Sequence, residues 1–314
     1  LAILGAIDAA AAAEEYVVTV YLNREWRNER VSFPLGSREQ RRHILRRHAL
    51  RDGEGRAVSY QIVPGPDGKP ERIVFLTDLA PFETRRFAFA GERTSAETDL
   101  VVEEEERTIR VGNSLTGISL RRTLEPGQGP VAAVRLASGR WIGGSALTAP
   151  RPPESCAVEV TAAGPVYAEA VSTVTFGAGR VWRLRARVYA HEPVVLLDES
   201  FTTADEPATF HLLLSEGFEP DSLLYRTGKG QIGRNLSGAI EPGLVATLEP
   251  WLYWWENERQ GQAFALVRSD RNDLLMLGAC MAGQWVDPAM PAERRTRPRA
   301  QLNLDGQGLH LDLP

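Results

Sequence analysis

The chain has 314 residues, of which 43% are hydrophobic and 25% charged, a globular composition that excludes wholesale disorder. Its net charge of −5 argues against nucleic acid as a partner, because binding to phosphate backbones needs a basic surface. No apolar run reaches the roughly 18 residues of a membrane span, so no membrane partner is expected.

The first residues are apolar or small. Leu1–Ala6 precedes Asp8 and the run Ala9–Ala13. This stretch resembles the end of a secretory signal, which predicts an extracellular or periplasmic location. An Ala-rich lead-in is the alternative reading.

Short segments of strand-like pattern, separated by turn residues, follow along the first part of the chain. The 28 glycines and 20 prolines are spread throughout, and helical periodicity is nearly absent. The expected strands up to the polar stretch Gly91–Thr98 are Tyr16–Leu22, Ala57–Val63, Arg72–Leu76 and Thr84–Ala90. We therefore expect a small N-terminal β-sandwich over residues 1–95.

The same pattern continues after the polar stretch. The expected strands are Thr108–Val111, Gly117–Arg121, Val131–Leu136, Ala157–Thr161, Val166–Phe176, Val181–Ala190, Val194–Phe201, Thr209–Leu214, Ala263–Val267 and Leu274–Leu277. Many short strands with frequent turns are typical of an all-β sandwich or barrel. The sequence predicts an all-β protein in which a large antiparallel β super-sandwich spans residues 96–314. The last residues, Leu309–Pro314, again alternate like a strand, and we expect further domains of the same polypeptide to follow.

The segment Arg180–Ala190 alternates between apolar residues and arginines. If Gly177–Gly179 joins it to the preceding strand, Val174 pairs with Trp182 and Glu169 with Arg187. The same reasoning across His191–Pro193 places Glu199 opposite Arg185. The arginine stripe is then mostly paired with carboxylates, and Arg183 alone has no partner, which makes it a candidate ligand contact.

No cofactor or metal is expected. Gly228–Gly233 matches the dinucleotide-binding string, but Arg234–Pro242 cannot form the helix that would receive the pyrophosphate. No His-Glu-x-x-His string and no Gly-x-Ser-x-Gly string occurs. His211 lies in an apolar strand, where a buried imidazole and a catalytic one are the two interpretations.

Tryptophans cluster with polar residues in the last third of the chain. Sugar rings offer apolar faces to aromatic planes and hydroxyls to acids, amides and arginine, so such runs are typical of a saccharide cleft. The candidate substrate-binding residues are Trp251, Trp254, Trp255, Asn257, Arg259 and Trp285, together with Arg183. Trp141 and Trp182 offer two alternatives, core packing or a place in the cleft.

Several segments resemble parts of large bacterial carbohydrate-active enzymes. Val17–Val31, Asp52–Gln61 and Leu79–Phe89 look like the small β domain of α-mannosidase-type hydrolases. Ile109–Asn113, Gly164–Glu169 and Glu192–Phe201 are similar to the galactose-mutarotase-like super-sandwich of exo-rhamnogalacturonan-lyase-like proteins. The resemblance covers roughly residues 16–210 and contains no catalytic signature. It implies a secreted β-sandwich portion of a polysaccharide-degrading enzyme.

Two classes of function follow. As an enzyme, the protein is a polysaccharide lyase or a glycoside hydrolase acting on a polysaccharide or oligosaccharide. A lyase would use Arg183 or Arg259 to neutralise a uronate, with Tyr253 and His211 as base and acid. A hydrolase would use the carboxyl pair Glu256 and Asp287, which must lie roughly 5–9.5 Å apart. The alternative is a non-catalytic carbohydrate-binding or structural β module.

Overall fold

The computed structural model describes most of the chain. The described residues are 15–36, 41, 48–92, 97–177, 179–201, 209–214, 217–226, 232–237, 244–248, 251–252, 260–261, 263–269, 271, 273–279, 300–305 and 308–313. Every strand pair among them is antiparallel, and the elements are strands throughout, so the predicted all-β fold class is confirmed. No helix in the described part of the chain has the length and apolarity that a membrane crossing requires.

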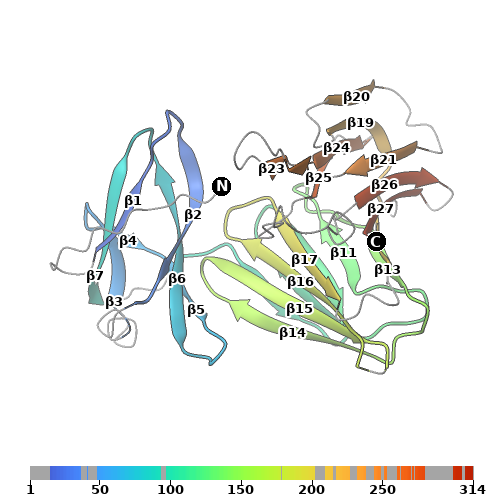
Figure 1. The fold of residues 1–314 in the computed structure, drawn as a ribbon, viewed down its shortest axis with the longest axis horizontal. Helices are drawn as coiled ribbons and strands as arrows, with labels where there is room; N and C mark the ends of the chain where they lie inside the picture. The colour runs from blue at the N-terminus through green and yellow to red at the C-terminus, as the bar shows by residue number, and fades with distance from the viewer. Residues whose placement is uncertain are drawn as a thin grey trace.

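The first seven strands form two facing sheets (Figure 1). One sheet has the order β1-β7-β3-β4, made of Glu15–Thr19, Thr84–Glu92, His48–Asp52 and Ala57–Val58. The other has the order β2-β6-β5, made of Trp26–Pro34, Pro70–Leu79 and Tyr60–Pro64. Their inner faces enclose a core of Tyr16, Val18, Val31, Leu50, Tyr60, Ile73, Phe75 and Phe87.

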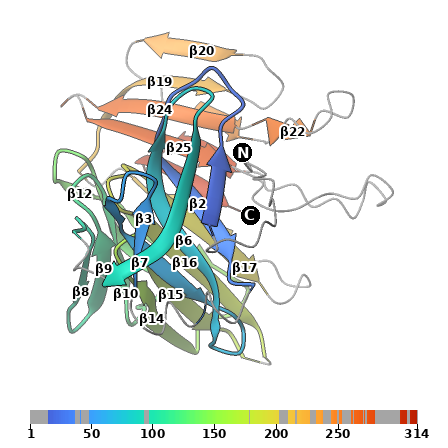
Figure 2. The same cartoon turned by 90° about the vertical axis from the view of Figure 1, so that its left-hand side faces the viewer.

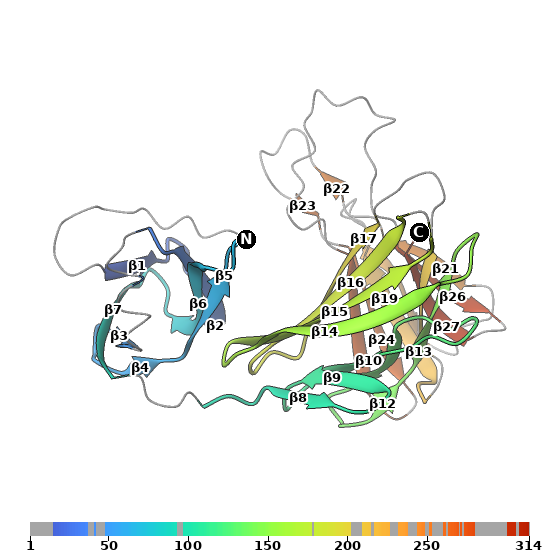
Figure 3. The ribbon, with the colours of Figure 1, turned by 90° about the horizontal axis from the view of Figure 1, so that it is seen from below.

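The strands β8–β18 supply two further sheets and part of a third. A five-stranded sheet has the order β12-β11-β10-β9-β8, made of Trp141–Ile142, Val131–Arg135, Gly117–Arg121, Thr108–Gly112 and Val101–Glu104. A four-stranded sheet has the order β14-β15-β16-β17, made of Ser155–Ala163, Tyr167–Thr175, Val181–Tyr189 and Val195–Phe201. These two sheets lie face to face (Figure 3) and share one apolar core.

The remaining strands complete the second part of the molecule. A five-stranded sheet has the order β13-β18-β27-β26-β21, made of Gly144–Thr148, Thr209–Leu213, Gly308–Leu313, Ala300–Asp305 and Leu244–Leu248. A four-stranded sheet has the order β20-β19-β24-β25, made of Ile232–Ser237, Pro220–Arg226, Ala263–Ser269 and Leu274–Ala279. The short pair β22 and β23, Trp251–Leu252 and Gln260–Gly261, stands beside them.

In the part of the chain that the structure describes, buried apolar residues form two main cores and a small one between them. The first core draws on residues 16–87 and the second on residues 109–311. The third contains Val74 from β6 together with Val166, Tyr167 and Tyr189. The predicted division after residue 95 falls between the first two cores and stays a prediction.

Strand β2 was missed by sequence reasoning. Its nine residues, Trp-Arg-Asn-Glu-Arg-Val-Ser-Phe-Pro, include only three large apolar side chains, and Val31 is the one that is buried. The strand also departs from regular pairing with β6 between Trp26 and Glu29. A period of two cannot be recognised where polar residues occupy both faces and the register shifts.

Candidate functional site

Most of the predicted cleft falls outside the described residues. The residues concerned are Tyr253, Trp254, Trp255, Glu256, Asn257, Arg259, Trp285 and Asp287. Trp251 begins β22, where its backbone pairs with Gly261 of β23. Their roles as catalytic or substrate-binding residues therefore stay predictions.

His211 lies on β18 and is half-buried. Its Nε2 atom forms a hydrogen bond of 3.1 Å with Thr148 Oγ1 on the neighbouring strand β13. Its ring lies 6.5 Å, centroid to centroid, from the ring of His310. No three His, Cys, Asp or Glu side chains among the described residues gather as a metal site would require. A catalytic role for His211 stays a prediction.

The structure distinguishes Trp182 from Trp141, for which the sequence allows both core packing and a place in the cleft. Trp182 is fully buried and packs against Phe210 with ring centroids 5.5 Å apart, so it is a core residue. Trp141 is 38% exposed, on β12, and the Arg110 guanidinium lies 5.5 Å from its ring centroid. Its indole also lies against the backbone of Gly117, where a Cβ would come within 3.3 Å of the ring.

The outer face of the β14–β17 sheet carries the arginine stripe. In β16, Trp182, Leu184, Ala186 and Val188 are buried, while Arg183 and Arg185 are exposed. Val174 pairs with Trp182 and Glu169 with Arg187, as the sequence predicts. The apolar face of β16 can reach the core only in this register, which turns the arginines outward.

Two of the three arginines are neutralised. Arg187 donates from Nε to Glu169 Oε2 at 2.7 Å, and its Nη1 atom donates to the Tyr189 hydroxyl at 3.2 Å. Arg185 lies 3.8 Å from Glu169 and 4.0 Å from Asp198. Arg183 has no hydrogen bond or ion pair to any residue that the structure describes. Its guanidinium is thus an exposed cation with its donors open to solvent.

The neighbours of Arg183 on this face are small and hydroxylated. Arg183 pairs with Thr173 of β15 on one side and with Ser200 of β17 on the other. One row further along, Thr175 and Ser155 form a hydrogen bond of 2.6 Å between their hydroxyls. Arginine with surrounding hydroxyls can bind a carboxylate in a bidentate manner and hydrogen-bond to a neighbouring sugar hydroxyl.

The predicted pairing of Glu199 with Arg185 is wrong by one residue. Asp198 lies opposite Arg185, and Glu199 lies opposite Leu184, on the core-facing side of the sheet. There Glu199 accepts a hydrogen bond from the indole N–H of Trp182. Although the residue as a whole is exposed, burial of its carboxyl group raises the pKa of Glu199, and the indole bond offsets this only in part.

The connection between β16 and β17 explains this difference. Asn113, from the β9–β10 connection, donates from Nδ2 to the carbonyls of Tyr189 and Glu192, at 2.7 Å each. Asp99 accepts from the His191 backbone N–H at 3.0 Å, and His191 adopts a left-handed φ of 60°. Burial opposes the charged form of Asp99, but bonds from Ser114 and His191 outweigh it and lower its pKa. Asn113 and Asp99, which are distant in the sequence, thus hold a connection that is one residue shorter than the predicted pairing assumes.

The N-terminal strands cover one end of the outer face. Arg30 of β2 donates to the Tyr189 hydroxyl and lies 5.1 Å from its ring centroid. Gln61 of β5 accepts from the backbone N–H groups of Val166 and Tyr167, at 3.2 and 2.9 Å. Burial, and then the nearby Glu29 carboxylate, raise the pKa of Glu192 at the same junction. Sequence reasoning missed these contacts because none of them follows from a local pattern.

Fold and site together define an all-β protein with a hydroxyl- and arginine-bearing sheet face. No family model matches the chain, and no curated protein matches it. Among solved structures, it is similar to an α-mannosidase from Enterococcus faecalis V583, with a TM-score of 0.46 and 12% sequence identity. The match covers 96% of this chain and 38% of that one. A similarity of this degree transfers no activity.

Proposed function

We propose that this chain binds an acidic polysaccharide through the outer face of the β14–β17 sheet, as the β-sandwich portion of a carbohydrate-active protein. The observation that supports it best is the exposed Arg183, which lacks a partner among the described residues although Arg185 and Arg187 have theirs. An unpaired guanidinium beside hydroxyls is suited to a uronate, since it matches the carboxylate with two parallel hydrogen bonds.

The overall negative charge of the protein limits where a polyanion can bind. With a net charge of −5, the molecule as a whole repels a polyanion, so attraction has to be local to a cationic group. If the protein also degrades the polysaccharide, the predicted catalytic residues are His211, Tyr253, Glu256 and Asp287. A non-catalytic binding module is the alternative, and it uses the same sheet face.

Affinity electrophoresis in gels that contain polygalacturonate tests the binding. Arg183→Ala should weaken retardation by about tenfold or more, because a hydrogen-bonded ion pair contributes about 1.5–3 kcal/mol. Arg183→Lys should retain only part of the affinity, since an ammonium cannot bind in a bidentate manner.

Arg86→Ala is the matched control. Arg86 is an exposed arginine on β7, where it forms an ion pair of 2.8 Å with Glu15. Its removal changes the net charge by the same amount as Arg183→Ala. It should leave retardation unchanged. Equal losses in both variants would indicate general charge attraction, and unchanged retardation of Arg183→Ala would remove this face from the proposal.

A further inference from the structure

A second feature lies at the far end of the N-terminal strands. Tyr21, Leu22 and Phe82, here called the tip patch, are 68%, 49% and 63% exposed. They come from the β1–β2 and β6–β7 connections, which lie side by side at one end of the two sheets (Figures 1 and 2). Large apolar side chains gathered at such exposure mark a site of contact with another molecule.

The two connections are hydrogen-bonded to each other. The Val20 N–H donates to the Glu83 carbonyl at 2.8 Å, and the Phe82 N–H donates to the Leu22 carbonyl at 3.4 Å. The tip patch is therefore carried by two connections whose backbones are held together, rather than by two independent loops.

Phe82 holds its exposed ring in a disfavoured backbone conformation. Its φ is 57°, in the left-handed region, at the turn position after Pro81 where glycine is the usual residue. A bulky residue in this region is uncommon, and such strain concentrates at functional positions. The chain thus keeps an aromatic ring on the surface at a place where glycine would fold more easily.

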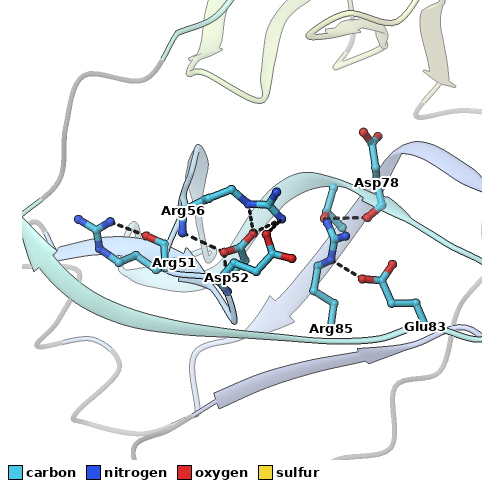
Figure 4. A network of polar contacts seen from close by, with 9 residues as sticks. Arg51, Asp52, Arg56, Asp78, Glu83 and Arg85 are labelled. Carbon is cyan, nitrogen blue, oxygen red and sulfur yellow. Dashed lines mark hydrogen bonds and ion pairs between the residues drawn. The ribbon is translucent and has the colours of Figure 1, made fainter.

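Glu83 braces the turn that presents Phe82, and Figure 4 shows its contact with Arg85. The Glu83 carboxylate accepts from the Ala80 N–H at 2.7 Å and from Arg85 Nε at 2.8 Å. Arg85 also donates from Nη1 to Thr77 Oγ1 at 3.3 Å, which ties the brace to β6. These bonds fix the base of the turn and leave the Phe82 ring outside it.

The small size of the tip patch favours a small ligand over a protein partner. A stable protein interface needs about 800 Å² on each partner and about 20–30 residues, far more than three side chains supply. Two aromatic rings and one leucine match one or two sugar rings instead, whose C–H faces pack on aromatic planes. The Tyr21 hydroxyl supplies a polar group for a sugar hydroxyl.

We propose, resting on the proposed function for the class of ligand, that the tip patch is a separate carbohydrate-binding site for one or two rings of a neutral glycan chain. Stacking on Tyr21 and Phe82 needs no charge on the sugar. The tip patch and the outer face carrying Arg183 then bind different glycans or different parts of one glycan, and their variants act independently.

Affinity electrophoresis with glucomannan, xyloglucan and galactan tests the site. Phe82→Gly removes the ring and relieves the left-handed strain. It should weaken retardation about two- to tenfold, the value of one lost stacking contact, while the melting temperature stays the same or rises. Tyr21→Ala should weaken retardation to a similar degree. A loss of affinity without a loss of stability cannot come from misfolding.

The controls separate this site from the first. Leu274→Ala removes an equally exposed apolar side chain on β25 and should leave retardation unchanged, as should Arg183→Ala. Absence of retardation by all three neutral glycans overturns the tip patch as a sugar site, as does unchanged retardation of Phe82→Gly. Dimerisation or vesicle binding that depends on Phe82 also overturns it. Binding to polygalacturonate that depends on Arg183 would stand in each of these cases.

Discussion

Trp182 and Glu199 illustrate how a single buried donor constrains its surroundings. The Trp182 indole is fully buried, so its N–H group needs an acceptor inside the sheet. Glu199, on the adjacent strand β17, supplies it. The sequence pattern identifies Trp182 as apolar and Glu199 as charged, and neither property indicates that the two side chains share a face.

Substitutions at Glu199 should separate acceptor from charge. Glu199→Leu leaves the indole N–H without an acceptor and should lower the unfolding free energy by about 1–3 kcal/mol. Glu199→Gln keeps a carbonyl acceptor and should cost less. Denaturant unfolding at neutral pH compares them, and equal losses in the two variants would contradict a role for the hydrogen bond.

The same pair predicts a pH dependence. Because the pKa of Glu199 is raised in the folded protein, its contribution to stability is present below the pKa of the unfolded chain and is lost as pH rises through the folded value. Relative to Glu199→Gln, the wild-type protein should therefore become less stable as the pH rises above about 4.3, the ordinary pKa of a glutamate. A difference between the two proteins that does not change with pH would contradict the assigned shift.

At the scale of elements, the β14–β17 sheet is held by a shared carboxylate. Glu169 of β15 is buried and bonds to Arg187 and approaches Arg185, both on β16. Arg187 also lies 4.7 Å from the Tyr167 ring centroid. These contacts fasten the end of the sheet that the N-terminal strands cover, whereas Arg183 has no such contact with any residue that the structure describes.

Removing that carboxylate should weaken the sheet. Glu169→Gln leaves the partly buried Arg187 guanidinium without its counter-charge and should lower the unfolding free energy by about 1–3 kcal/mol. Glu159→Gln, an exposed position on the same face of β14, should change it by less than about 0.5 kcal/mol. Equal effects at the two positions, measured by denaturant unfolding, would show that the Glu169 contacts contribute little.

The register of this sheet was only partly predictable. The β15–β16 pairing follows from the alternation of β16 and the short Gly177–Gly179 connection, and it is confirmed. The predicted β16–β17 pairing was wrong because Asn113 and Asp99 hold the connection between the two strands. These two residues lie nearly 80 residues or more from it along the chain. A local pattern determines a hairpin only where its turn is local too.

At the scale of the whole molecule, the junction between the N-terminal strands and the β14–β17 sheet depends on the close approach of Gly164 to Gln61. Gly164 lies against the Gln61 side chain, and a Cβ at this position would overlap the buried amide. That amide accepts from two backbone N–H groups, so it cannot move without breaking both bonds. Glycine at position 164 thus permits the two parts to dock.

A methyl group at this position should loosen the junction. Gly164→Ala should lower the melting temperature and speed proteolytic cleavage, because the displaced Gln61 leaves two buried N–H groups unpaired, at about 1–3 kcal/mol. Gly36→Ala is the control, since a Cβ there meets nothing within 4 Å. Cleavage of both variants at the wild-type rate would mean that the junction does not rely on this contact.

The sequence by itself determined the all-β class and the inward and outward faces of β16. Both are consequences of the period of two, which is local. Only the tertiary structure decided the face of Glu199, the junction at Gln61 and the tip patch. Each of these brings together residues from separate connections, where the outcome depends on how distant parts of the chain pack.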